Sequence, residues 1–154
     1  MTWINSRAMR QCDNRPVTEY ARMPPAPDAT AIAHLVDRFY DRVQADPVLG
    51  PVFNPVVHDW AEHKALLTSF WCSVALRAAT YRGNPMAVHR PLPIDAAHFD
   101  HWLALWRDTA QSLLPAEQAD TMVDYAQRIG RSLRYGLGID GNQRPLGLPV
   151  ARSG

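Results

Sequence analysis

The chain has 154 residues, 47% of them apolar, and its 16 lysines and arginines balance 15 aspartates and glutamates. This length predicts one domain with a hydrophobic core. The charge balance argues against a nucleic acid or an anionic membrane as partner. The two cysteines have no partners at metal-binding spacing, so we expect reduced thiols in a cytoplasmic protein. No apolar run reaches transmembrane length, and polar residues interrupt any signal-peptide core near the start.

Residues 1–28 show no periodicity and end in a proline-rich run, which predicts a loosely ordered leader, with Met23 as an alternative start. Asp28 or Thr30 then caps a first amphipathic helix over 29–45. Its apolar residues recur at three- and four-residue spacing, as a buried helix face requires; they are Ile32, Val36, Phe39, Tyr40 and Val43.

The prolines at 47, 51 and 55 predict a tight connector over 48–55 with a short 3₁₀ turn, whose one large apolar residue is Phe53. His58 or Asp59 opens a second helix that runs to about Ala78. One face of this helix is apolar and also carries His63; its members are Trp60, His63, Leu66, Leu67, Phe70, Trp71 and Val74.

A short stretch over 83–93 is bounded by helix breakers on both sides: Gly83 and Pro85 before it, Pro91 and Pro93 after it. Only one or two helical turns fit between them, and they end in His89. A neutral imidazole held on such a short segment can place one ring nitrogen at a metal ion. Alone, the stretch favours a histidine that caps the end of a helical turn.

Asp95 begins a third helix, and Pro115 lies in the first turn of a fourth, which Gly136 and Gly138 end. No segment alternates with period two over a useful length, so the predicted fold class is all-α. We expect the folded domain to cover 29–136, followed by a frayed tail over 137–154.

The chain carries no HExxH motif, zinc spacing, GxSxG motif or glycine-rich phosphate loop. His98 and His101 are three residues apart and can in principle chelate a metal. Three polar-tipped side chains point inward from apolar faces: Tyr40, His63 and Trp102. Each alone reads as an ordinary core residue. Together, opposite a histidine ligand, they suggest a cavity for a flat, mostly apolar cofactor with one axial ligand.

The order and spacing of six motifs resemble the bacterial truncated haemoglobins of group III over about residues 29–136. The motifs are FY at 39–40, DPVLGPVFN at 46–54, WAEHK at 60–64, FW at 70–71, YRGNPMAVH at 81–89 and HFDHWL at 98–103. This resemblance implies a two-over-two helical sandwich around haem b. The leader and the tail lie outside it.

The resemblance also implies the site residues. His89 matches the proximal axial ligand of a pentacoordinate haem iron, Tyr40 and Trp102 match the distal donors to a bound ligand, and His63 matches a distal gate. Trp71 matches a tryptophan that this group keeps along the second helix. The expected haem contacts are His89, Phe39, Phe53, Leu66, Leu67, Tyr81, Met86 and Arg90. Arg77, Arg82, Arg90 and Tyr81 remain alternatives for holding the haem propionates.

The implied function is reversible binding of O₂, NO and CO with slow release of oxygen. Nitric-oxide dioxygenase or peroxidase-like turnover, with peroxide as a ligand and a reductase as partner, extends that function. A gas sensor or store without turnover is the alternative, and a helical interaction domain without cofactor is a third. We expect a monomer or weak dimer.

Overall fold

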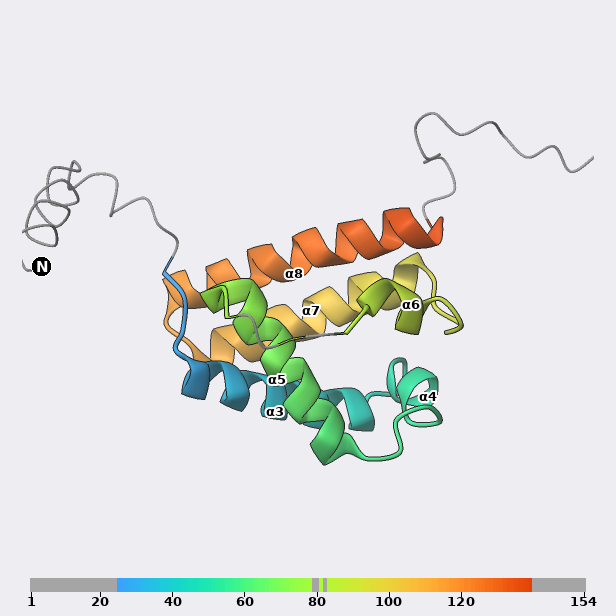
Figure 1. The fold of residues 1–154 in the computed structure, drawn as a ribbon, viewed down its shortest axis with the longest axis horizontal. Coiled ribbons are helices and arrows are strands. Elements are labelled where there is room, and N and C mark those ends of the chain that lie inside the picture. The colour runs from blue at the N-terminus through green and yellow to red at the C-terminus, as the bar shows by residue number, and fades with distance from the viewer. Residues whose placement is uncertain (1–24, 79–80, 82, 140–154) are drawn as a thin grey trace, which may run out of the picture.

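The computed structural model describes residues 25–78, 81 and 83–139, and every regular element among them is a helix (Figure 1). The predicted all-α class is confirmed. The helices are α3 Ala29–Ala45, α4 Gly50–Phe53, α5 Trp60–Leu76, α6 Pro85–His89, α7 Ala96–Leu113 and α8 Ala116–Leu137. Most of the predicted leader and tail, together with Met23 and Arg82, lie outside the described residues. No helix in the described part of the chain is both long and apolar enough to cross a membrane.

Acidic side chains cap the N-termini of three predicted helices, α3, α5 and α7. Asp28 Oδ1 accepts from Ala31 N at 2.8 Å, and Asp59 Oδ1 accepts from Glu62 N at 3.1 Å. Asp95 forms a capping box with His98 at the start of α7. These carboxylates satisfy backbone N–H groups that have no partner inside the helix. Asp28 and Asp59 are therefore the caps, rather than the neighbouring alternatives.

Three helix boundaries differ from the prediction. The expected 3₁₀ turn is a single α-helical turn, α4, with Pro51 in its first turn. Helix α5 ends at Leu76 instead of Ala78, because Arg77 adopts the left-handed conformation with φ 55°. Gly136 lies inside α8, which ends at Gly138 with φ 69°. Only a residue that tolerates positive φ ends such a helix without strain, so Gly138 is the stop signal.

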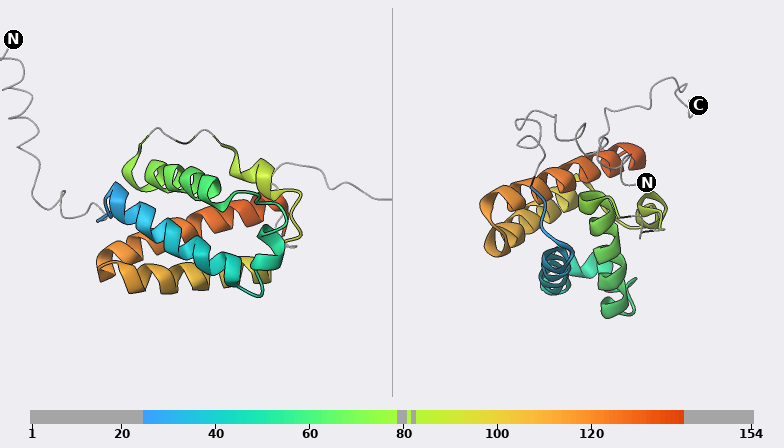
Figure 2. Two further views of the ribbon diagram at one scale, coloured as in Figure 1. Left: turned by 90° about the horizontal axis from the view of Figure 1, so that it is seen from below. Right: turned by 60° about the vertical axis from the view of Figure 1, so that its left-hand side comes forward.

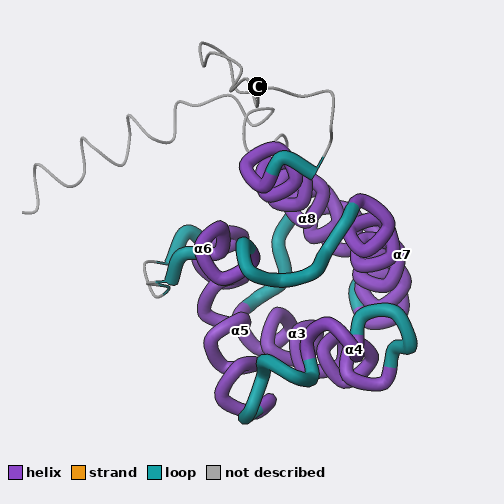
Figure 3. Tube along the Cα trace, turned by 90° about the vertical axis from the view of Figure 1, so that its right-hand side faces the viewer, coloured by secondary structure: helices purple, strands orange, loops and turns teal. Residues whose placement is uncertain are grey.

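The helices form the predicted two-over-two arrangement. Helix α7 packs on α8, α3 packs on α5, and α3 lies against α7 (Figure 3). Helix α6 approaches only α8 among the described helices, near the C-terminal end of α8 (Figure 2). Within the described residues, helix α6 therefore has no close backbone approach to α3 or α7.

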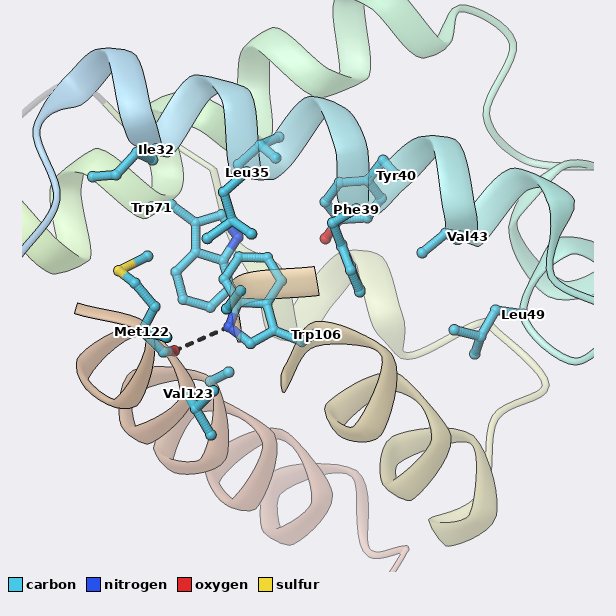
Figure 4. Close-up of a cluster of buried hydrophobic side chains, with 14 residues drawn as sticks. Ile32, Leu35, Phe39, Tyr40, Val43, Leu49, Trp71, Trp106, Met122 and Val123 are labelled. Atoms are coloured by element: carbon cyan, nitrogen blue, oxygen red, sulfur yellow. Dashed lines mark hydrogen bonds between the residues drawn. The ribbon is translucent and has the colours of Figure 1, made fainter. Parts of the chain in front are cut away.

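Aromatic side chains fill the centre of the core (Figure 4). The ring of Trp106 stacks on Trp71 with a centroid distance of 4.4 Å, and Phe39 meets Trp106 edge-on at 4.9 Å. The Trp106 indole Nε1 donates to the Met122 carbonyl at 3.1 Å, which ties α7 to α8. Large buried rings contribute most of the apolar area in a core of this size, so this cluster fixes the relative positions of α3, α5, α7 and α8.

Candidate functional site

A cavity of about 910 Å³ lies between α5, α6, α7, α8, the C-terminal half of α3 and the α4 connector. This volume falls within the range of sites that hold cofactors and small molecules, and the lining is mainly apolar. Tyr40, His63, His89 and Trp102 all line it. The four residues on which the functional prediction depends therefore share one cavity.

His89 is presented to this cavity by α6, the single short helix of the breaker-bound stretch. Asn84 caps α6 by accepting from Ala87 N at 3.2 Å, and Pro85 follows at the first position, where its missing N–H is harmless. His89 Nδ1 lies 2.6 Å from the Pro85 carbonyl oxygen. A carbonyl can only accept, so Nδ1 carries the proton and Nε2 of the neutral ring keeps its lone pair. This is the arrangement in which an imidazole serves as a metal ligand.

Three polar-tipped side chains reach the cavity from α3, α5 and α7. Tyr40 and His63 meet edge-on with ring centroids 6.3 Å apart, and Trp60 meets His63 in the same way at 5.6 Å. Trp102 comes from α7 and contacts Phe39, which is next to Tyr40 on α3. A phenol, an imidazole and an indole thus lie around one region of the cavity.

A lysine next to His63 fixes the rotation of α5 against α3. Lys64 Nζ bonds Asp37 Oδ1 at 2.9 Å and Asp41 Oδ1 at 2.5 Å, one helical turn apart on α3. The lysine side chain is largely covered, so the two ion pairs are held in one geometry. With Lys64 directed at α3, the preceding residue, His63, is turned toward the cavity.

Burial sets the protonation of the two titratable groups of this cluster. The pKa of Tyr40 is raised well above the ordinary value of a phenol because the side chain is buried, and the nearby indoles of Trp102 and Trp71 offset part of that rise. The pKa of His63 is lowered by burial and, secondarily, by its electrostatic interaction with His89. Tyr40 is therefore a neutral hydroxyl donor at any physiological pH, and His63 favours its neutral form.

The eight predicted cofactor contacts divide into two groups. Five of them line the cavity: His89, Phe53, Leu66, Leu67 and Tyr81. The other three are not among the lining residues, and their role as cofactor contacts stays a prediction. Phe39 is fully buried among the core rings, and the end of the Met86 side chain lies against Gly136 of α8. Arg90 lines a separate, smaller cavity of about 200 Å³ that also touches His89.

Several apolar lining residues were missing from the predicted contacts, among them Val56, Val57, Leu92 and Ile94. They flank the connector and the segment after His89, where no helical period identifies a buried face. The available signal was their chemistry alone: apolar residues next to Pro55, Pro91 and Pro93, in segments without a helical period.

The alternative metal pair has other partners. His98 Nδ1 lies 2.9 Å from Asp95 Oδ1 in the capping box, and His101 Nε2 lies 2.7 Å from Asp46 Oδ2. Within residues 25–78, 81 and 83–139 there is no cluster of three or more His, Cys, Asp or Glu side chains that could hold a bare metal ion. Both histidines stabilise helix ends instead.

Comparison with known proteins defines the class of protein to which this fold and site belong. The family model of the bacterial-like globins matches residues 28–133, so the chain belongs to the bacterial-like globin family.

The chain is 33% identical over 104 residues to the "Group 3 truncated hemoglobin ctb" of Campylobacter jejuni, a match that covers 64% of this chain and 82% of that protein. It is 35% identical over 80 residues to the "Group 2 truncated hemoglobin YjbI" of Bacillus subtilis, covering 50% of this chain and 60% of that protein. The crystal structure of the group III truncated haemoglobin from C. jejuni superposes with a TM-score of 0.69 at 30% identity, over 73% of this chain and 92% of that one. The predicted resemblance to group III truncated haemoglobins is confirmed.

The residues present fit the haem that globins hold. Three of the exposed large apolar side chains line the cavity: Val56 at 51% exposure, Leu66 at 46% and Val88 at 61%. Apolar side chains gathered around one opening indicate a bound group that covers them. An imidazole with a free Nε2 lines the same cavity. An apolar site with one nitrogen ligand suits a porphyrin better than a bare ion.

Proposed function

We propose that this chain holds haem b through His89 and reversibly binds O₂, NO and CO. When bound, the haem supplies the iron that takes up the diatomic ligand. His89 would ligate the iron, and its hydrogen bond to the Pro85 carbonyl fixes the tautomer and orients the ring. Tyr40, His63 and Trp102 line the same cavity and would contact the diatomic ligand. Phe53, Leu66 and Leu67 also line it and would pack on the porphyrin, and Tyr81 is the candidate propionate partner that lines the cavity.

The distal residues determine how tightly oxygen is held. The Tyr40 hydroxyl and the Trp102 indole N–H donate to the partial negative charge of the bound ligand, and each contributes on the order of 1 kcal/mol or more in a dry pocket. His63 is a third donor or a gate between the cavity and solvent. Donors of this kind slow the release of oxygen, which suits scavenging or redox chemistry better than delivery.

One observation carries the proposal: His89, with Nδ1 committed to a carbonyl, lines the same cavity as Tyr40, His63 and Trp102. A core histidine whose two ring nitrogens both form hydrogen bonds inside the protein would not be expected to line an apolar cavity. The arrangement is supported by the family membership of the chain.

The test is a haem titration of the purified protein followed by absorption spectra of the ferric, ferrous and carbonmonoxy forms. The chain should bind one haem with a Soret band. Replacement of His89 by Ala should abolish stable retention, whereas replacement of His34, an exposed histidine of α3 remote from the cavity, should leave the titration unchanged. A chain that takes up no haem is an interaction domain, and the proposal fails.

The proposal also includes enzymatic turnover, as a nitric-oxide dioxygenase or with peroxidase-like activity, with an unidentified reductase as partner. The gathering of three donors around one small region favours it, because the same donors that hold oxygen also assist cleavage of a peroxide O–O bond. A sensor or store without turnover uses the same pocket and is the alternative. Stopped-flow mixing of the oxy form with nitric oxide separates them: rapid, stoichiometric nitrate formation supports turnover, and slow formation leaves the sensor or store. We propose a monomer or weak dimer.

A further inference from the structure

One buried polar atom has no hydrogen bond within the described part of the chain: the indole nitrogen of Trp71. The Trp71 side chain is 1% exposed, so water does not serve it. Buried tryptophans almost always place their N–H against an acceptor, and an unpaired one calls for an explanation. Trp71 lines the cavity, so this unpaired N–H belongs to a side chain of the functional site.

Stacking fixes the orientation of this indole. The Trp71 ring lies within 22° of parallel to Trp106 and within 19° of parallel to Trp102, at centroid distances of 4.4 and 6.4 Å. In Figure 4 the indole nitrogens of the two stacked rings point in different directions. Trp106 Nε1 points toward the Met122 carbonyl, and Trp71 Nε1 points toward the side of the core that holds the Tyr40 hydroxyl. In agreement, the Trp71 indole lowers the pKa of Tyr40, as does the indole of Trp102.

The chemistry of a phenol makes this placement informative. A phenol oxygen can accept hydrogen bonds but has a single hydrogen to donate. When the Trp71 N–H occupies one accepting position of this oxygen, the phenolic hydrogen must point elsewhere, and the cavity that Tyr40 lines is an available direction. Accepting a hydrogen bond also polarises the hydroxyl and makes it a stronger donor.

We propose that Trp71 is a positioning residue of the distal pocket: its Nε1–H donates to the Tyr40 hydroxyl oxygen and holds the phenolic hydrogen toward the ligand. The contact does not reach hydrogen-bond geometry in the present structure. It closes when a ligand in the cavity draws the phenol, as site hydrogen bonds commonly do on binding. Trp71 does not touch the ligand, so its influence passes through Tyr40. This inference rests on the proposed gas-binding function.

A double-mutant cycle tests the coupling. The variants are Trp71→Phe, Tyr40→Phe and the double substitution, with Trp106→Phe as the matched control, because Trp106 shares the stack but bonds Met122. The readouts are the oxygen dissociation rate and the C–O stretching frequency of the carbonmonoxy form. Trp71→Phe should speed oxygen release roughly three- to tenfold, because part of the stabilisation from one hydrogen bond is lost. The same substitution should shift the C–O band.

In the Tyr40→Phe background, Trp71→Phe should change neither quantity, and Trp106→Phe should change both much less than Trp71→Phe does in the wild-type background. Equal effects of Trp71→Phe in both backgrounds would mean direct contact or general packing and would overturn the proposal. So would an effect of Trp106→Phe as large as that of Trp71→Phe, or no effect of Trp71→Phe at all.

A second measurement keeps Trp71 intact and guards against a variant that does not fold. In the diamagnetic carbonmonoxy protein labelled with ¹⁵N-tryptophan, Tyr40→Phe should move the Trp71 Nε1–H resonance upfield and speed its exchange with solvent. The Trp106 resonance should stay in place. An unmoved Trp71 signal refutes the contact. If the purified chain carries no haem, the proposed function fails, while the same two resonances still report whether Trp71 and Tyr40 interact.

Discussion

Replacement of Asp46 should destabilise the corner between α3 and α4 more than any single surface change. Asp46 ends α3, and its carboxylate accepts three hydrogen bonds: from Val48 N at 2.8 Å, from Leu49 N at 2.9 Å and from His101 Nε2 at 2.7 Å. Its side chain is 11% exposed. The pKa of Asp46 is lowered although burial opposes ionisation, because the His101 and backbone hydrogen bonds favour the carboxylate.

The magnitude follows from these bonds. Asp46→Ala leaves the Leu49 amide and the His101 ring without their acceptor, and at roughly 1 kcal/mol for each of two to three bonds the loss is about 2–3 kcal/mol. Asp46→Asn keeps an amide oxygen for the two backbone N–H groups and loses mainly the charge toward His101, so about 1 kcal/mol is expected. The Ala variant should then melt roughly 6–10 °C below wild type.

The assay is urea unfolding at pH 7 followed by circular dichroism, with both variants and His101→Ala measured together. Because the folded-state pKa of Asp46 is depressed, its contribution is present above the unfolded value near pH 3.9 and is lost as pH falls through the folded value. The difference between wild type and Asp46→Ala should therefore shrink in acid. Equal stabilities of the Ala and Asn variants, or a difference between wild type and Asp46→Ala that does not shrink in acid, would refute this reasoning.

Three further changes follow from single features of the structure. Arg77→Gly should raise stability by about 0.5–1 kcal/mol by thermal melting, because φ is 55° at this position, while Arg77→Ala should give no gain. Lys64→Met should cost roughly 0.5–1 kcal/mol at low salt and less at 1 M salt, since it removes the pairs with Asp37 and Asp41 but keeps the apolar stem. Because the folded-state pKa of His63 is lowered, the unfolded chain binds a proton more readily, and part of the stability is lost as pH falls below about 6.5. In His63→Leu the free energy of unfolding should therefore depend less on pH between about 7.5 and 5.

The sequence alone was sufficient to predict helix caps and helix lengths where a local rule determines the geometry. Asp95 caps its helix as expected, and Asp28 and Asp59 do so as one of the two residues expected at each start, because N-capping depends only on a side-chain oxygen and the next three residues. His89 ends a single helical turn because breakers on both sides leave no other length. The apolar spacing of the first helix predicted α3 at its observed bounds.

Side-chain direction inside a short or crowded element was harder to predict. Phe39 and Tyr40 are adjacent, yet one helical step turns Phe39 into the core and Tyr40 toward the cavity. Met86 and Arg90 belong to the same short segment as His89, but they leave α6 on other sides and face α8 and a second cavity. A motif fixes which residues are near a site, whereas helix phase decides which of them reach it.

The apolar face of α5 illustrates a different limit. Only Trp71 on this helix is fully buried, and Leu66 is 46% exposed, although the sequence predicted a continuous inward face. The pattern was correct in spacing, but part of that face borders the cavity instead of another helix. A sequence does not distinguish a face that packs on protein from one that packs on a cofactor.

The central claim, that His89 holds the iron, is tested most directly by resonance Raman spectroscopy of the ferrous, ligand-free protein. Iron held by His89 should give an iron–imidazole stretching line that shifts on ¹⁵N-histidine labelling, disappears in His89→Gly and returns when free imidazole is added. A line that survives unchanged in His89→Gly would assign the iron to another side chain and contradict the account.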